Sequence, residues 1–526
     1  MKPIACCLFL VLTFPVIAQQ HREIQTVEVI EVPVYVTGAA GSLTGLTRDN
    51  FELLVNGKPQ SIDYFDVIDF STVSSGGQPT PAAHRDMRQR RLYMLVFDLL
   101  FSTPNSIQRA QAAAEKLLTK AGEADEFAVA AFTHNRGLEI IVPFTRDRLT
   151  TTRAIRQLRT GAMADTLRLG MNNEEIAQLQ EATSDTMRGE SAVGEEVCDP
   201  RSACAELLRD RGRDTVVHQI QELGALAPRL AALEGQKHVV LLSNGFPPNL
   251  VTGVMPRPRP VDPKVTGQPD NTAKMIMPVG APQSDPHSIN ALRKLAVAYG
   301  AAGVFLDAID TAGLRPGGYL EENEALVMMA RDTGGDVIDK DNDLTHALET
   351  LTDRERIVYV LGFHAHETRK KENAITVRLL GVEGHPDLRY RRTYSSIVDK
   401  PKRMDAIRLA DIVINDIPQN GIEVLTEVDG TNVDVKIPLA PLLAQIDNRA
   451  DLDVLLYVFS GNRAIATKEK RIAIDRDRVA AAKGNAAIHF AQQFDLPPGD
   501  YLAKVIVTMD GTTSAGFARE AFTVMP

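Results

Sequence analysis

The sequence predicts a mixed α/β chain in which a doubly wound, mainly parallel sheet is flanked by β-sandwich modules. Two apolar runs that end on small polar residues, 92–98 and 238–245, are typical of buried parallel strands. Strand-like and helix-like segments alternate over residues 91–363, the pattern of a parallel sheet with helices on both faces. Short strands with regular turn signals stand toward both ends of the chain, which favours antiparallel modules there.

Length and composition set the class of protein. A chain of 526 residues is too long for one core and fits about three domains. The apolar fraction of 44% and the charged fraction of 24% are ordinary for a folded globular protein. A net charge of −10 argues against a nucleic-acid surface and against binding to anionic membranes.

The first residues predict export. Lys2 precedes an apolar stretch, 4–17, and small residues stand before Gln19. This pattern indicates a signal peptide over residues 1–18, and therefore a secreted or periplasmic protein. Cys6 and Cys7 lie inside the stretch without a convincing lipoprotein motif, so a lipid anchor is the lesser alternative. No later segment has the roughly 18 uninterrupted apolar residues of a transmembrane helix, so none is expected in the mature chain.

Two cysteines remain after cleavage, Cys198 and Cys204. In an oxidising compartment, a close pair most simply forms a local disulfide. The alternative is a reactive or metal-binding pair, but no histidine or aspartate stands beside them at a zinc-binding spacing.

The N-terminal β strands are expected over residues 24–70, where Asn56-Gly57 predicts a type I′ hairpin turn. A Ser-, Gly- and Pro-rich linker follows at 71–83. Residues 357–395 return to β, and we expect them to pair with 24–70 as one β module. The α/β domain, 85–356, would then be inserted between the two halves of that module.

Inside the α/β domain, Pro104 suits the start of a helix and Asp285-Pro286 caps another. The expected helices are 104–121, 148–158, 285–302, 321–331 and 344–351, with a polar helical region at about 165–236. The expected strands are 92–97, 127–132, 138–142, 238–243, 303–309 and 337–338. Residues 405–526 are interpreted as β throughout and are expected to form a C-terminal β-sandwich.

Several segments together resemble the bacterial VWFA-related proteins first grouped from acidobacteria. The resemblance covers residues 24–395 and includes Gly45-Leu46-Thr47-Arg48-Asp49-Asn50-Phe51-Glu52, Val96-Phe97-Asp98, Leu241-Leu242-Ser243-Asn244-Gly245, Leu306-Asp307-Ala308-Ile309-Asp310, Thr333-Gly334-Gly335 and Tyr359-Val360-Leu361-Gly362-Phe363. It implies a von Willebrand factor A-like fold in an exported protein, and it implies nothing about the last 120 or so residues.

The resemblance also implies a place for a metal. An intact A-type site has a D-x-S-x-S motif after the first strand, a loop threonine and an aspartate after the fourth strand, which together hold Mg²⁺. Asp98 and Ser102 match the first and last motif positions, and Thr166 is the candidate loop threonine. Leu100 replaces the middle serine and Asn244 stands in place of the later aspartate. We therefore expect a degenerate site that holds no metal cofactor; the alternative role of Asp98 is to cap the adjacent turn or helix.

Other candidate ligands are weaker. The run Asp339-x-Asp341-x-Asp343 lacks the glycine and the final glutamate of a calcium loop, so Asp343 is expected to be a helix N-cap. His364 and His366 share one face of a strand end but lack a third ligand. The sequence has no recognisable catalytic motif, and we expect a protein that is not an enzyme.

The loop over 246–285 is proline-rich and leaves the strand edge where an α/β sheet places its ligand. We expect it to act as a partner-binding flap rather than as a plain linker. The predicted partner-binding residues are Asp98, Ser102, Asn244, Arg257 and Arg259. The expected function is non-catalytic adhesion to a protein or an envelope surface. The alternatives are an envelope hydrolase that uses Asp98 or the His364/His366 pair, and a structural envelope component.

Overall fold

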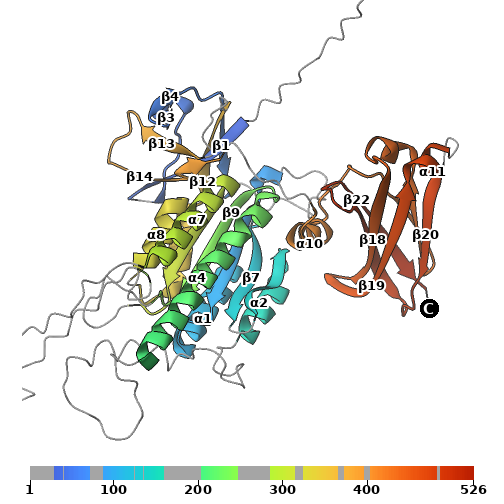
Figure 1. Ribbon diagram of the computed structural model, residues 1–526, viewed down its shortest axis with the longest axis horizontal. Coiled ribbons are helices and arrows are strands. Elements are labelled where there is room, and N and C mark those ends of the chain that lie inside the picture. The colour runs from blue at the N-terminus through green and yellow to red at the C-terminus, as the bar shows by residue number, and fades with distance from the viewer. Residues whose placement is uncertain are drawn as a thin grey trace, which may run out of the picture.

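The computed structural model describes most of the chain in three parts: a β module, an α/β domain and a C-terminal β-sandwich (Figure 1). The described residues are 29–39, 41–71, 87–123, 125–133, 136–158, 203–246, 251, 285–313, 324–339, 341–364, 372–395, 403–481 and 486–525. The predicted signal peptide, the predicted linker at 71–83 beyond Ser71 and most of the predicted proline-rich flap lie outside these residues. No helix in the described ranges has the length and apolarity to cross a membrane.

The α/β domain is built on a six-stranded sheet in the order β11-β10-β9-β6-β7-β8. The pairs β11-β10, β10-β9, β9-β6 and β6-β7 are parallel, and β8 runs antiparallel to β7. Because β7 lies on one side of β6 and β9 on the other, the strand order reverses between β6 and β9. The strands are β6 (Arg91–Asp98), β7 (Asp125–Thr133), β8 (Gly137–Thr145), β9 (Gln236–Ser243), β10 (Val304–Asp310) and β11 (Val337–Ile338).

Helices cover both faces of this sheet because its central strands are buried on both sides. Leu92, Met94 and Val96 of β6 pack in one core with α4, α7 and α8. Tyr93 and Leu95 alternate with them and pack in a second core with α1, α2 and α9. The helices are α1 (Pro104–Lys120), α2 (Arg148–Gln157), α4 (Ala203–Ala231), α7 (Pro286–Ala302), α8 (Glu324–Thr333) and α9 (Leu344–Arg354).

The β module consists of two antiparallel sheets, β14-β1-β12-β5 and β15-β13-β3-β4, with β2 beside β1. Strands from the two distant chain segments pair directly, with Val32 opposite Leu361 and Leu53 opposite Val377. The strands are β1 (Val29–Gly38), β2 (Gly41–Ser42), β3 (Phe51–Val55), β4 (Lys58–Gln60), β5 (Tyr64–Asp69), β12 (Ile357–His364), β13 (Asn373–Leu379), β14 (Asp387–Tyr390) and β15 (Thr393–Tyr394). Among the described residues, parallel strand pairs therefore occur in the α/β domain alone, and the described part of the chain is mixed α/β.

The C-terminal part contains two antiparallel sheets, β16-β17-β20 and β19-β18-β21-β22, that share one apolar core. The strands are β16 (Leu425–Asp429), β17 (Asn432–Pro438), β18 (Arg449–Ser460), β19 (Arg463–Asp475), β20 (Ala487–Gln493), β21 (Gly499–Met509) and β22 (Ala515–Val524). A short helix, α11 (Arg476–Ala481), follows β19.

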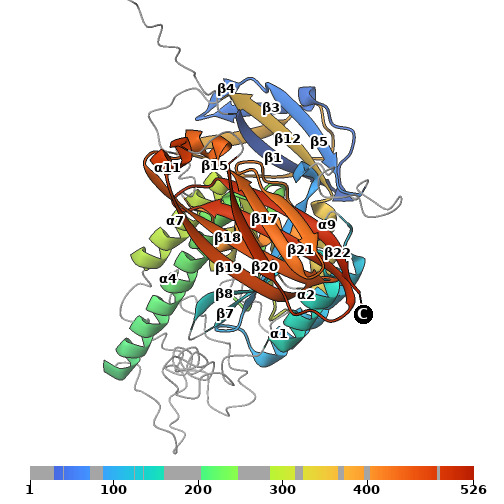
Figure 2. The same cartoon turned by 90° about the vertical axis from the view of Figure 1, so that its right-hand side faces the viewer.

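The interpretation of residues 405–526 as β throughout is wrong at its start, where helix α10 (Ala406–Asn415) forms. Asp405 caps this helix by accepting a hydrogen bond from the backbone N–H of Ile407 at 2.7 Å. Ile412 and Val413 then pack on the outer face of the sandwich, while Asn415 donates to the carbonyl of Phe144 in β8. Helix α10 thus lies between the sandwich and the edge of the α/β sheet (Figure 1), and the strands of the sandwich face the viewer in Figure 2.

Candidate functional site

The carboxyl ends of β6 and β9 meet where the strand order reverses, which is where open α/β sheets place their sites. Asp98 ends β6 and Ser243 ends β9, and the Ser243 hydroxyl donates to Asp98 Oδ2 at 2.6 Å. This contact agrees with the prediction from the sequence that the ends of these two strands lie together at one edge of the sheet.

Asp98 is fully buried, and both of its carboxylate oxygens accept hydrogen bonds from the protein. Oδ1 accepts from the backbone N–H groups of Leu100 at 3.0 Å and Phe101 at 3.1 Å, which closes the turn after β6. Burial raises the pKa of the Asp98 carboxyl, and the hydrogen bonds that it accepts oppose this rise. Asp98 therefore caps the turn after β6, which is the role that the sequence indicates as the alternative to metal binding.

Ser102 and Asn244 continue the polar edge. The backbone N–H of Asn244 donates to Ser102 Oγ at 3.1 Å, and Thr311 Oγ1 donates to Asn244 Oδ1 at 2.7 Å. Ser102 is fully buried and Asn244 is half-buried. The structure therefore brings together Asp98, Ser102 and Asn244, and it adds Ser243 and Thr311, which the sequence analysis did not select.

The amide of Gln219 in α4 is the least satisfied group of this edge. It is fully buried and approaches Asp98 closely enough to lower the pKa of the carboxyl. It reaches no well-aligned hydrogen-bond partner within the described residues.

The described edge does not fit a hard cation as it is arranged. Mg²⁺ requires about six oxygen ligands in near-octahedral geometry. The resemblance would require a serine hydroxyl as a metal ligand at position 100. Leu100 has no such oxygen, and its backbone N–H donates to Asp98. Both Asp98 oxygens already face protein donors. Thr166, Arg257 and Arg259 lie outside the described residues, so the metal ligand set and the flap stay predictions.

The other candidate residues are placed as follows. Asp343 caps α9 by accepting from the backbone N–H groups of Thr345 and His346, which confirms its predicted role. His364 Nδ1 lies 2.7 Å from Asp63 Oδ2 on the exposed surface. His366 and Cys198 lie outside the described residues. Cys204 lies within α4, and the predicted disulfide stays a prediction.

A buried charged cluster, which we call the histidine cluster, joins the α/β domain to the β module. Nδ1 of His238 in β9 lies 3.1 Å from Asp307 Oδ2 in β10 and 3.1 Å from Glu355 Oε1, which precedes β12. Its Nε2 lies 2.9 Å from the hydroxyl of Tyr35 in β1. Arg389 of β14 donates to Glu355 Oε1 at 2.7 Å.

The electrostatics of the histidine cluster keep His238 charged. Burial alone would lower the pKa of His238, but the carboxylates of Glu355 and Asp307 outweigh it and raise the pKa to about 9. Burial alone would raise the pKa of Glu355, but His238 and Arg389 lower it to about 2. Burial and the neighbouring Glu355 raise the pKa of the Asp307 carboxyl, and the hydrogen bond with His238 opposes this rise. Glu355 is therefore the carboxylate that most favours the charged form of His238.

His238, Asp307 and Glu355 are also the described residues that could together hold a metal. Both ring nitrogens of His238 already have partners, and Arg389 lies beside the carboxylates, so bound metal would add charge next to a fixed cation. The cluster fits an ionic link between domains better than a metal centre. The sequence signal was His238 directly before the apolar run 239–242, and Asp307 between Leu306 and Ala308.

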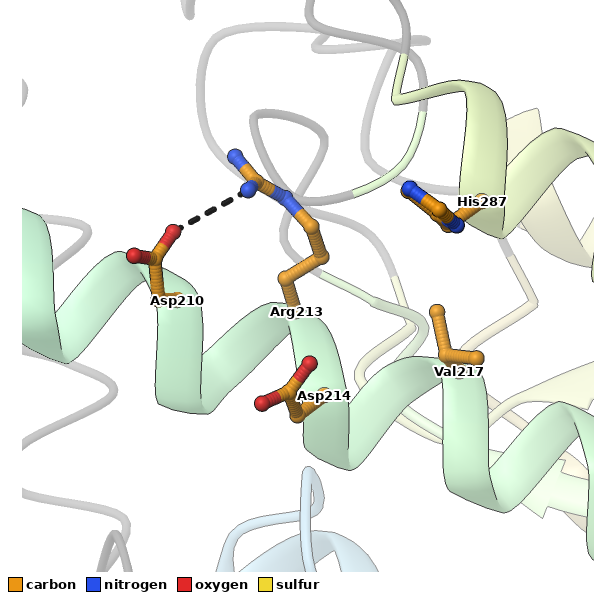
Figure 3. A pocket seen from close by; sticks show the side chains of 5 residues that line it. All are labelled: Asp210, Arg213, Asp214, Val217 and His287. Carbon is orange, nitrogen blue, oxygen red and sulfur yellow. Dashed lines mark hydrogen bonds and ion pairs between the residues drawn. The ribbon is translucent and has the colours of Figure 1, made fainter.

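A surface hollow of about 380 Å³ lies between the start of α7 and residues 210–217 of α4 (Figure 3). It is lined by Asp210, Arg213, Asp214, Val217 and His287. Arg213 is paired with Asp210 at 3.0 Å, and its Nε lies 3.6 Å from Asp285 Oδ1. The guanidinium group of Arg213 in this hollow therefore lies near two carboxylates of the protein.

Comparisons with known proteins found no matching family model and no matching curated protein. Among solved structures, the vWF domain of the type V pili tip protein Mfa5 from Porphyromonas gingivalis is similar at 14% identity, covering 53% of this chain and 98% of that chain, with a TM-score of 0.23. BatB from Bacteroides thetaiotaomicron is similar at 10% identity, covering 50% and 98%, also with a TM-score of 0.23.

Proposed function

We propose that the chain is an exported, non-catalytic binding protein that engages a protein or envelope-surface partner at the carboxyl edge of its α/β sheet. The observation that supports this is the polar edge at the strand-order reversal, where Asp98, Ser102 and Asn244 come together. Ligands of open α/β sheets bind at such a reversal. Because Asp98 is occupied by protein donors, binding should not require a metal.

The test is capture of partners from envelope extracts by the purified mature chain. Asn105 is exposed at the start of α1 on this edge, and Glu123 is exposed beyond the other end of the same helix. Asn105→Arg should reduce the captured partner severalfold, whereas Glu123→Arg should leave it unchanged. EDTA should have no effect on capture. Loss of capture in EDTA, or equal capture by both variants, would contradict the proposal.

The rival proposal is an envelope hydrolase. The exposed pair of His364 and Asp63 is one described arrangement that could support general-base chemistry. Screening the mature chain against generic esters, peptides and glycans separates the two classes. Turnover that disappears in His364→Ala would favour the hydrolase, whereas no turnover above background supports the binding protein.

Export itself is part of the proposal. We expect the mature chain to begin close to Gln19, which mass spectrometry of the protein recovered from the envelope or the medium would measure. Recovery of a soluble cytoplasmic form that retains residues 1–18 would contradict it.

A further inference from the structure

The C-terminal sandwich has a long open strand edge. β19 lies at the end of its four-stranded sheet, with β18 as its hydrogen-bonded neighbour within the described chain. Every residue from Arg463 to Arg471 is exposed except the half-buried Ala466. One irregularity in the pairing falls at Ile465, near the hairpin, so 466–473 forms a regular edge. Such an edge presents unpaired backbone N–H and C=O groups to a further strand.

The two faces of β19 differ in charge. In the register with β18, Lys468 lies opposite Leu456 and Lys470 opposite Val454, both fully buried. The two lysines therefore lie on the core-facing side of the sheet. They are nevertheless exposed, because the core does not extend to this edge.

These lysines also have no ion-pair partner within the described residues. On the opposite face, Arg471 pairs with Asp510 at 2.5 Å and lies near Asp451 and Asp453. The open edge therefore presents two unmatched positive charges at alternate positions of a strand in a chain with net charge −10.

A second copy of β19 fits this edge poorly. Antiparallel self-pairing centred on Glu469 would place Lys468 opposite Lys470 and Glu469 opposite its own copy. Like charges directly opposite each other are destabilising in a sheet. A strand with carboxylates at alternate positions would instead face both lysines with opposite charges.

We propose that β19 binds an extended acidic segment of a partner protein, which adds as an antiparallel strand and places two carboxylates, spaced i and i+2, opposite Lys468 and Lys470. The backbone groups of β19 form the hydrogen bonds with the added strand, and the two lysines favour acidic side chains in it. This surface is independent of the edge of the α/β sheet, so either proposal can fail without the other.

The test uses the full mature chain and a synthetic peptide, Thr-Val-Glu-Val-Glu-Val-Thr-amide with an uncharged fluorophore on its amino terminus, and binding is followed by fluorescence anisotropy. In an added strand, one alternate set of amide N–H groups faces β19 and the other faces solvent. N-methylation of one set should therefore abolish binding, whereas N-methylation of the other should not. Hydrogen exchange should slow over residues 466–473 when the peptide binds.

Charge reversal provides the control. The Lys468→Glu/Lys470→Glu variant should bind the acidic peptide at least tenfold more weakly and should gain binding of the peptide with lysine in place of glutamate. Lys436→Glu, an exposed lysine in β17, should change neither. Binding of the lysine peptide also shows that the variant is folded.

Three outcomes would overturn the inference. The first is no binding of the acidic peptide at up to ~1 mM. The second is equal binding of both N-methylated peptides, which would indicate attraction by charge without strand addition. The third is unchanged binding by the charge-reversed variant, which would place the site elsewhere.

Discussion

His238 shows how one buried proton can stabilise the contact between two domains. Its pKa is raised from 6.5 to about 9 because Glu355 and Asp307 favour the charged ring. A raised pKa stabilises the folded state fully below about pH 6.5, and the contribution is lost as the pH rises through about 9. The shift corresponds to about 3 kcal/mol for a fully buried group.

We predict that the free energy of unfolding falls between pH 6.5 and 9.5 in the wild type and falls less in His238→Gln. Urea unfolding at several pH values would measure both slopes. The comparison with the variant removes the contribution of surface groups that titrate in the same range. Parallel slopes for the two proteins would show that His238 is not charged in the fold.

Asp98 supports a second prediction at this scale. Asp98→Asn keeps one oxygen for the N–H groups of Leu100 and Phe101, so it should change stability by about 1 kcal/mol or less. Asp98→Ala leaves those buried donors unpaired and should cost about 2–4 kcal/mol. Millimolar Mg²⁺ should not alter the thermal midpoint of the wild type. Calorimetry showing tight Mg²⁺ or Mn²⁺ binding that disappears in Asp98→Ala would contradict this prediction.

Among the elements, helix α10 connects the α/β domain to the C-terminal sandwich, and the sequence patterns did not predict it. Arg90, just before β6, donates to Asp411 Oδ1 of α10 at 2.6 Å and to Glu126 Oε2 of β7 at 2.5 Å. On its other side, Lys504 of β21 donates to the carbonyl of Val413 at 2.8 Å and pairs with Asp416. The helix is therefore held by charged groups from both neighbours.

We predict that Arg90→Met costs about 3–5 kcal/mol, because it leaves the buried Asp411 without the cation that it contacts, while Glu126 keeps its ion pair with Arg146. Adding Asp411→Leu should recover part of this loss, because it removes one uncompensated charge. A double-mutant cycle in denaturant would measure the coupling between Arg90 and Asp411. Additive effects of the two substitutions would indicate that the pair contributes no coupling energy.

Sequence patterns predicted the elements whose signals are local. Pro104 and Asp285 mark the helix starts that the structure shows, and Asn56-Gly57 adopts positive φ angles of 51° and 78° in a hairpin turn. Helix α10 is only ten residues long and strands follow it, so the sequence pattern of the whole segment indicated β structure and the helix was not predicted. The histidine cluster was not predictable from spacing, because its partners are brought together by pairing between distant segments.

At the scale of the whole molecule, the α/β domain interrupts a β hairpin. Asp69 at the end of β5 lies opposite Ile357 at the start of β12, and the backbone N–H of Phe70 donates to the carbonyl of Arg356 at 3.0 Å. The chain therefore leaves the β module and returns to it at adjacent points. All six strands of the α/β sheet lie between those points. Tyr35 and Arg389 of the β module nevertheless complete the histidine cluster of the inserted domain.

This arrangement predicts which parts fold alone. Residues 85–356 contain a complete sheet and should unfold cooperatively, but at lower stability than in the full chain, because the histidine cluster loses Arg389 and Tyr35. Residues 20–84 should stay unfolded, because their strands lack β12, β13 and β14 as partners and leave open edges. Joining residues 20–69 to 357–395 through a two-residue Asn-Gly turn should restore a folded module, because the turn closes a hairpin that is already in register. Circular dichroism and urea unfolding of the three chains would measure this, and cooperative unfolding of 20–84 by itself would show that the two halves do not need each other.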